Sequence, residues 1–159
     1  MGKKEFKTNV MRVLDQKKIE YKSHSYADTD AISGKEVAEA LGENPDRVFK
    51  TLVTQGNSRN YYVFMIPVLM ELDLKKAAKA VSEKSIAVIK AKDLLPLTGY
   101  VHGGCSPVGM KKQFKTTIHH TAKDFDTFYF SAGKIGYQVE TSLDELIKVI
   151  PFELSDVTE

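Results

Sequence analysis

The chain of 159 residues has the length of one domain, and its apolar fraction of 42% is enough for a buried core. Its formal net charge of only +2 excludes a protein that coats nucleic acid through phosphate neutralisation alone. The single cysteine, Cys105, excludes an internal disulfide and a Cys-based metal knuckle. The sequence shows neither an apolar run of membrane-spanning length nor a secretory signal, so we expect one cytoplasmic domain over residues 1–159.

The first part of the chain predicts two short helices. Apolar residues, among them Phe6, Val10 and Leu14, recur at roughly helical spacing over residues 4–19 and predict an amphipathic helix. Ser33 is followed three residues later by Glu36, which is a capping-box pattern, and Gly42 stands where a helix would end. We therefore expect a second helix between Ser33 and Gly42.

The middle of the chain predicts a hairpin followed by alternating helix and strand. Val48–Thr54 and Tyr61–Val68 are β-rich runs on either side of a polar loop, which is typical of an antiparallel hairpin. Asp73 is a candidate cap for a helix carrying Leu74, Ala77, Ala78 and Val81. A short buried strand over Ile86–Ile89 and a helix over 91–98, closed by Gly99, are then expected.

The last third predicts three more strands and a final helix. The strands are expected at Thr116–His120, Phe128–Ser131 and Tyr137–Glu140, and Ser142 with Glu145 repeats the capping box of a helix that ends before Pro151. Hairpins mixed with helices at irregular intervals indicate an α+β fold. We expect a curved mixed, barrel-like sheet surrounded by helices.

Lys50 shares its face of the first hairpin strand with Val48 and Leu52. A lysine on an edge strand that discourages aggregation or reaches out to water explains this pattern without a function. A second interpretation is a cationic anchor in a pocket, where a desolvated ammonium binds a phosphate or carbonyl oxygen more strongly than in bulk water. Pattern alone leaves both open.

The segment Gly103–Gly109 contains three glycines, which let a backbone approach a ligand and direct N–H groups at an anion or a carbonyl oxygen. A plain turn is the alternative. Cys105 is a candidate nucleophile if His102, His119 or His120 lies near it, and a buried structural thiol is the alternative. The sequence contains no compact Cys/His ligand set, so we expect no metal.

A second glycine-containing stretch, Ser131–Glu140, lies between two predicted strands, and we expect either a simple hairpin or one wall of a cleft whose other wall is the first glycine segment. Lysines also cluster in three places. Solvated surface explains each cluster, and a few phosphate contacts near a site is the other interpretation. The clusters are at positions 75, 76 and 79, at 90 and 92, and at 111, 112 and 115.

Four blocks of the sequence resemble the YbaK/EbsC family, which is related to the editing domain inserted in bacterial prolyl-tRNA synthetases. Their order and separations also match, so the resemblance covers essentially the whole chain. The blocks are His24-Ser25-Tyr26 ahead of Gly34-Lys35-Glu36-Val37-Ala38, then Val48-Phe49-Lys50-Thr51-Leu52, then Gly99 to Gly109, and Ser131-Ala132-Gly133-Lys134-Ile135-Gly136.

The resemblance implies roles for particular residues. Lys50 is expected to anchor the tRNA terminus or its ester region, and the backbone of Gly103 and Gly104 to bind the substrate. Tyr26 is implied as a substrate-pocket residue. The wider substrate-binding set that the resemblance implies is Cys105, Ser106, Gly133, Lys134, Gly136 and Gln138. Many relatives have an aspartate where this chain has Gln138, and a glutamine cannot act as a carboxylate base.

The resemblance also implies the activity: hydrolysis of a wrongly charged tRNA at its 3′ end, with cysteine on proline tRNA as the expected substrate and the substrate's own thiol attacking the ester. No metal or cofactor is implied. Removal of another small amino acid such as alanine, and a non-catalytic module that binds a tRNA end or a nucleotide, are the alternatives, with a Cys105 hydrolase as a third. The sequence leaves open whether a prolyl-tRNA synthetase delivers the substrate.

Overall fold

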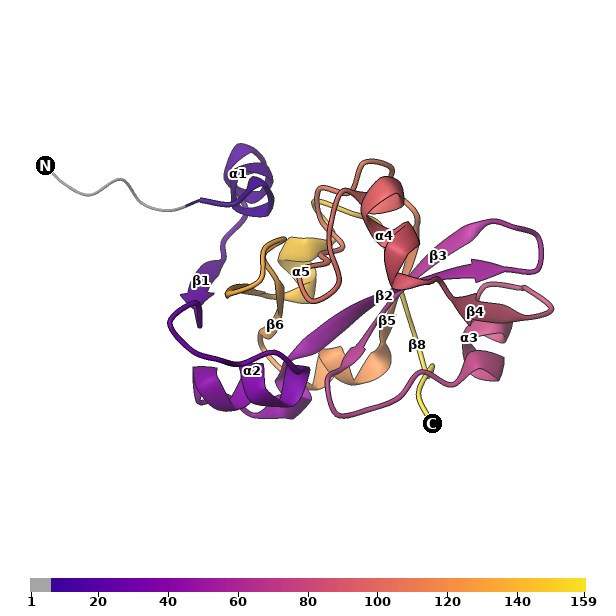
Figure 1. The fold of residues 1–159 in the computed structure, drawn as a ribbon, viewed down its shortest axis with the longest axis horizontal. Helices are drawn as coiled ribbons and strands as arrows, with labels where there is room; N and C mark the ends of the chain where they lie inside the picture. The colour runs from indigo at the N-terminus through magenta and orange to yellow at the C-terminus, as the bar shows by residue number, and fades with distance from the viewer. Residues whose placement is uncertain (1–6) are drawn as a thin grey trace, which may run out of the picture.

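The computed structural model describes residues 7–159, which form two β-sheets with helices packed around them (Figure 1). One sheet has the strand order β1-β7-β6 and the other the order β4-β2-β3-β5-β8. The strands are β1 (Lys22–Ser25), β2 (Phe49–Gly56), β3 (Tyr61–Pro67), β4 (Ile86–Val88), β5 (Lys115–His119), β6 (Phe128–Ser131), β7 (Tyr137–Thr141) and β8 (Glu153–Ser155).

The predicted α+β class and the mixed sheet are confirmed, although the strands do not close into one barrel-like sheet. The five-stranded sheet is mixed because β2 runs antiparallel to β3 and β4, whereas β5 runs parallel to β3 and β8. The three-stranded sheet is antiparallel throughout. A single bridge between Val48 and Tyr129 brings the start of β2 beside β6, so the two sheets meet at this point.

The hairpin predicted from the two β-rich runs is confirmed as β2 and β3. Thr51 lies opposite Met65, and Lys50 lies opposite Ile66. Successive residues of β3 enter different hydrophobic clusters, with Met65 in the main core and Ile66 in a second cluster that includes Ala77 and Ala78 of α3. Because both faces of β3 are covered, its sequence is an uninterrupted apolar run.

Five helices are present in the described chain: α1 (Asn9–Gln16), α2 (Gly34–Leu41), α3 (Leu74–Ala80), α4 (Ala91–Thr98) and α5 (Leu143–Leu146). The capping predictions are confirmed for the second and third. Ser33 and Glu36 form a complete capping box on α2, and Asp73 accepts hydrogen bonds from the first backbone amides of α3. None of the helices in residues 7–159 is long and apolar enough to cross a membrane.

The ends of the chain differ from the sequence-based expectations. The first helix was predicted over residues 4–19, but α1 ends at Gln16 because Lys18 adopts a left-handed φ of 57°; Phe6 lies outside the described residues. The last helix is a single turn. Glu145 does not complete its capping box, because its carboxylate accepts a hydrogen bond from the Glu20 amide at 2.8 Å instead.

The sequence-based predictions missed two strands, β1 and β8, and were wrong about the burial of a third, β4. β1 and β8 are short and polar, so no apolar alternation marks them, and they are recognised only by their neighbours β7 and β5. The strand predicted as buried at Ile86–Ile89 is the edge strand β4, in which Ile86 is buried and Val88 is 50% exposed. Leu74 is likewise exposed at the start of α3.

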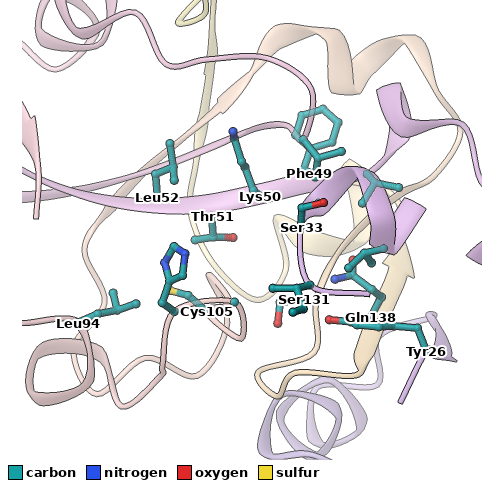
Figure 2. Close-up of a pocket in the computed structure, with 17 residues that line it drawn as sticks. Tyr26, Ser33, Phe49, Lys50, Thr51, Leu52, Leu94, Cys105, Ser131 and Gln138 are labelled. Carbon is teal, nitrogen blue, oxygen red and sulfur yellow. The ribbon is translucent and has the colours of Figure 1, made fainter. Parts of the chain in front are cut away.

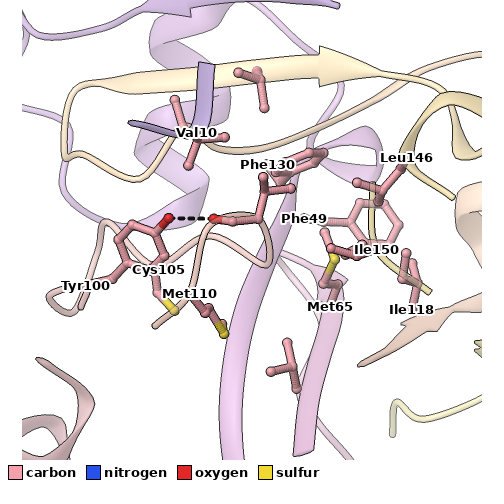
Figure 3. Packing of buried hydrophobic residues seen from close by; sticks show 14 of the residues in the cluster. Val10, Phe49, Met65, Tyr100, Cys105, Met110, Ile118, Phe130, Leu146 and Ile150 are labelled. Carbon is pink, nitrogen blue, oxygen red and sulfur yellow. Dashed lines mark hydrogen bonds between the residues drawn. The ribbon is translucent and has the colours of Figure 1, made fainter. Parts of the chain in front are cut away.

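The main hydrophobic core holds the glycine-rich segment in place (Figure 3). Tyr100, Cys105, Val108 and Met110 from this segment pack against residues of β2, β3 and β6, and the Tyr100 hydroxyl donates a hydrogen bond to the Val108 carbonyl. A loop anchored by several buried side chains has little freedom to move. The intervening residues, including Gly103, therefore have a fixed position relative to β2.

Candidate active site

A cavity of about 200 Å³ lies between α2 and the first half of β2 on one side, and β6, β7 and the loop after α4 on the other. Figure 2 shows its labelled residues in a row, with Tyr26, Ser131 and Gln138 at one end, Thr51 and Cys105 in the middle, and Leu94 at the other end. The lining residues are Tyr26, Ile32, Ser33, Gly34, Val37, Val48, Phe49, Lys50, Thr51, Leu52, Val68, Leu94, His102, Gly103, Cys105, Ser131 and Gln138.

The cavity follows the edge of β2 because this strand is only partly covered. β3 pairs with β2 from Phe49 to Gln55, but on its other side β4 pairs only with Thr54–Gly56. Among the described residues, no strand pairs with the Lys50–Leu52 segment on that other side. This edge of β2 therefore faces the cavity and not another strand.

Lys50 and Thr51 leave β2 in opposite directions, as neighbours in a strand must. Figure 2 shows Thr51 directed toward Cys105, whereas the Lys50 ammonium is directed away from Cys105, Ser131 and Gln138. The resemblance implied that Lys50 and the backbone of Gly103 both bind the substrate. Both residues line the cavity, but the ammonium lies at its border and the Thr51 hydroxyl faces the interior.

One end of the cavity is polar and is built by neighbouring strands. Ser131 of β6 and Gln138 of β7 are register partners, and they flank the turn that contains Gly133 and Gly136. The Tyr26 amide donates a hydrogen bond of 2.7 Å to the Gly136 carbonyl, which fixes Tyr26 beside this pair. Tyr26 and Gln138 are both buried, with 5% and 6% of their surface exposed.

Two side-chain oxygens in the cavity wall, Oγ1 of Thr51 and Oε1 of Gln138, are buried and have no hydrogen-bond partner within residues 7–159. A buried polar atom without a partner costs roughly 1–3 kcal/mol, so most buried polar groups in folded proteins are paired. Both atoms belong to residues that line the same cavity. Thr51 can donate or accept, whereas the Gln138 oxygen can only accept.

The two glycine-containing segments contact each other, so they do not form opposite walls of the cleft. A Cβ atom at Gly104 would lie 3.1 Å from the Ile135 amide nitrogen, which leaves no room for a side chain there. Gly103 has a φ of 90° and lines the cavity. The lining residues do not include Gly104, Gly133, Lys134 and Gly136 of the expected site.

Cys105 lines the cavity but is a poor nucleophile. It is 7% exposed, and burial raises the pKa of its thiol to about 12, so the reactive thiolate is scarce at neutral pH. The neighbouring Ser106 is completely buried outside the cavity, and its hydroxyl accepts a hydrogen bond from the Val108 amide. Both side chains hold the loop in shape.

The sequence did not predict a site role for three polar residues that line the cavity: Ser33, Thr51 and Ser131. Ser33 caps α2 and was assigned only that role. Thr51 directly follows Lys50, and Ser131 lies two residues before Gly133, so both stand within the sequence blocks that carry the resemblance. Because neighbouring residues of a strand point to opposite faces, the residue beside each candidate could have been considered as well. Away from the cavity, His119, His120 and Asp156 have potential metal-ligand atoms within 4.8 Å of one another, but Asp156 is ion-paired with Lys76 at 3.1 Å.

The chain is similar to one protein-family model and to two named proteins. The model of the aminoacyl-tRNA editing domain family matches residues 28–149. A protein of Enterococcus faecalis, named as a proposed Cys-tRNA(Pro)/Cys-tRNA(Cys) deacylase, EbsC, is 43% identical over 153 residues, which cover 96% of this chain and 93% of that protein. Proline–tRNA ligase of Fervidobacterium nodosum is 28% identical over 126 residues, which cover 79% of this chain and 21% of the ligase.

Solved structures show the same fold. One that is described as a proposed trans-editing enzyme for prolyl-tRNA synthetase superposes with a TM-score of 0.81 at 22% identity, and the match covers 94% of each chain. The same overall fold is therefore adopted by a sequence that shares only 22% of its residues with this chain.

Proposed function

Because this chain belongs to the aminoacyl-tRNA editing domain family, we propose that it is an aminoacyl-tRNA deacylase that removes cysteine wrongly attached to proline tRNA. The match confirms the family expected from the four sequence blocks. The relative from Enterococcus faecalis, at 43% identity over nearly the full length of both chains, supports cysteine as the amino acid. We place the reaction in the cytoplasm, since the substrate is a charged tRNA.

The observation that carries the proposal is the pair of unpartnered oxygens in the cavity wall. An aminoacyl ester presents an α-ammonium group, which can only donate hydrogen bonds, and an ester carbonyl, which can only accept them. The Gln138 oxygen matches the first group, and the Thr51 hydroxyl matches the second. A glutamine in place of an aspartate thus keeps the acceptor for the ammonium and gives up only the negative charge.

The size of the cavity supports a small acyl group. At about 200 Å³ it is smaller than the roughly 300–1,000 Å³ of pockets that take drug-sized ligands. Apolar side chains such as Phe49, Leu52 and Leu94 complete its lining. The cavity therefore suits the side chain and ester of one small amino acid, and the nucleotide must lie outside it.

The reaction requires no nucleophile from the protein if the cysteine substrate supplies its own. The substrate sulfur attacks the ester carbonyl, a carbon–sulfur bond forms, and the carbon–oxygen bond to the tRNA breaks. The thiol proton passes to the departing 3′ oxygen, and water later opens the cyclic thioester to free cysteine. The protein then contributes positioning and stabilisation of the carbonyl oxygen by pre-oriented donors.

Thr51 is well placed to stabilise the negative charge that develops on the carbonyl oxygen, and Gly103 lines the opposite side of the same cavity. Lys50, at the border of the cavity, is available for the ester oxygen or for a phosphate of the tRNA terminus. We infer that Lys50 holds the nucleotide while Thr51 and Gln138 hold the acyl group.

We propose editing in trans, because a solved structure with the same fold is described as a proposed trans-editing enzyme for prolyl-tRNA synthetase. The matching segment of the Fervidobacterium ligase makes up only 21% of that synthetase, so the same kind of domain occurs inside a much longer protein. We propose that this chain acts on tRNA after its release from, or together with, a prolyl-tRNA synthetase. No metal is assigned a role.

A panel of charged tRNAs tests the proposal. Proline tRNA carrying cysteine, alanine, serine or proline is incubated with the protein, and the half-life of each ester is measured against a protein-free control. We expect a shortened half-life for the cysteine ester above all. Faster loss of alanine would assign the enzyme to another small amino acid, and a lengthened half-life for every ester would identify a binding module that protects the tRNA end.

A further inference from the structure

A surface track leads away from the apolar end of the active-site cavity. A second cavity, of about 150 Å³, shares Thr51, Leu52, Leu94 and His102 with the first, so the two are neighbours. A third, of about 600 Å³, shares Val88, Ile89 and Lys90 with the second. The three cavities therefore lie one after another, from the active site along the edge of β2 to the groove between β4 and α4.

The outer part of this path is lined by groups that suit a nucleic acid strand. Lys90 and Lys92 line it at the point where the chain passes from β4 into α4 (Figure 1), and Asp93 is the acidic residue among its lining. Lys90 and Lys92 are both exposed. Tyr61, whose ring packs against Phe114 at 5.5 Å between centroids, presents an aromatic surface in the same groove.

We propose that this track, defined by Tyr61, Val88, Lys90, Lys92 and His102, binds the unpaired nucleotides that precede the charged 3′ adenosine of the tRNA. The inference rests on the proposed function, because it takes the acyl group to lie at the Gln138 end of the cavity. The ribose then leaves toward Leu94, at the opposite end of the row in Figure 2, where the second cavity begins.

The physical case combines shape with charge. The active-site cavity is too small for a nucleotide, so the RNA must leave it, and the neighbouring cavities lie on one side of its apolar end. Single-stranded nucleic acids bind where a positively charged groove follows the backbone and aromatic side chains stack on the bases. Of the three lysine clusters in the sequence, the pair at 90 and 92 lies on this route, whereas Lys75 and Lys79 lie on α3, in a separate pocket.

The test compares two double variants that each remove two lysines. K90A/K92A alters the track, and K75A/K79A is the matched control on α3. Each protein is assayed with Cys-tRNA(Pro) and with 3′-cysteinyl-adenosine, which has the ester but no preceding nucleotides. We expect K90A/K92A to lower the ratio of kcat/KM for the tRNA to kcat/KM for the small ester about tenfold, a factor of roughly three per exposed charge contact.

Salt dependence gives an independent measurement. Each phosphate contact on a single strand contributes about −0.7 to the slope of log K against log salt, so two lost contacts should flatten the slope for tRNA by about 1.4 in K90A/K92A and leave it unchanged in K75A/K79A. If K90A/K92A and K75A/K79A had equal kcat/KM ratios and equal salt slopes, the proposed track would be wrong. If the wild-type protein hydrolyses neither ester, the proposed function fails, and binding of uncharged tRNA(Pro) under the same salt series still decides the track.

Discussion

Replacement of Thr51 by valine should separate the stability of the protein from its activity. Valine has nearly the shape of threonine and favours strands, so T51V removes the hydroxyl with little change in packing. In the free protein the Thr51 hydroxyl oxygen is buried and has no partner within residues 7–159. Removing a buried polar atom that makes no hydrogen bond is expected to stabilise the protein by about 1 kcal/mol.

The stability gain is large enough to measure. For a domain of this length, about 1 kcal/mol corresponds to roughly 2–4 °C in Tm. Urea unfolding followed by far-UV circular dichroism should show a higher midpoint with an unchanged m-value. Activity should change in the opposite direction, because the loss of one donor to a developing oxyanion lowers kcat by about a hundredfold.

The chain offers matched controls for this experiment. Thr117 on β5 also has a buried hydroxyl without a partner in the described chain, but it does not line the active-site cavity. T117V should therefore raise the Tm without loss of activity. The Thr54 hydroxyl donates to the Tyr62 carbonyl at 3.0 Å, so T54V should lower stability. A T51V protein with full activity would refute the assignment of Thr51 to the acyl group.

Three further predictions concern single side chains. Lys50→Ala should keep the fold, with the free energy of unfolding within about 0.5 kcal/mol of wild type, and lose at least about tenfold in kcat/KM; unchanged deacylation would contradict its anchoring role. Cys105→Ala should retain most of the turnover, since its thiol pKa of about 12 leaves little thiolate, and an inactive but folded variant would revive the thiol mechanism. Burial and the neighbouring His120 lower the pKa of His119, so its imidazole takes up a proton more readily in the unfolded chain. Stability should therefore fall as the pH drops below about 6.5, and His119→Gln should flatten this dependence in urea titrations at several pH values.

Much of the local structure could be predicted from the sequence because local rules decide it. The Ser33 cap, the left-handed glycines at 42 and 99, and the β2–β3 hairpin all follow from side-chain chemistry within a few residues. The strands β1 and β8 could not be found in this way, because their short polar sequences become strands only through pairing with β7 and β5.

For the candidate site, the sequence identified several residues but not the directions of their side chains. Sequence blocks singled out Tyr26, Lys50, Gly103, Cys105 and Gln138, and all five line the cavity. Which way each side chain points was not predictable. Whether Lys50 or its neighbour enters the cavity depends on how β2 is oriented against the β6–β7 pair, and the Val48–Tyr129 bridge sets that orientation across 81 positions of the chain.

By itself, the sequence determined the α+β class, the family, the caps and turns, and the short segments in which the chemistry resides. These depend on residue type and spacing, which the chain carries locally. Only the tertiary structure decided that the two glycine segments pack against each other, that the Thr51 and Gln138 oxygens have no partner within residues 7–159, and that lysines 90 and 92 line one groove beside α4. The reason is physical: burial and hydrogen-bond satisfaction are properties of groups brought together from distant parts of the chain, and no local pattern encodes them.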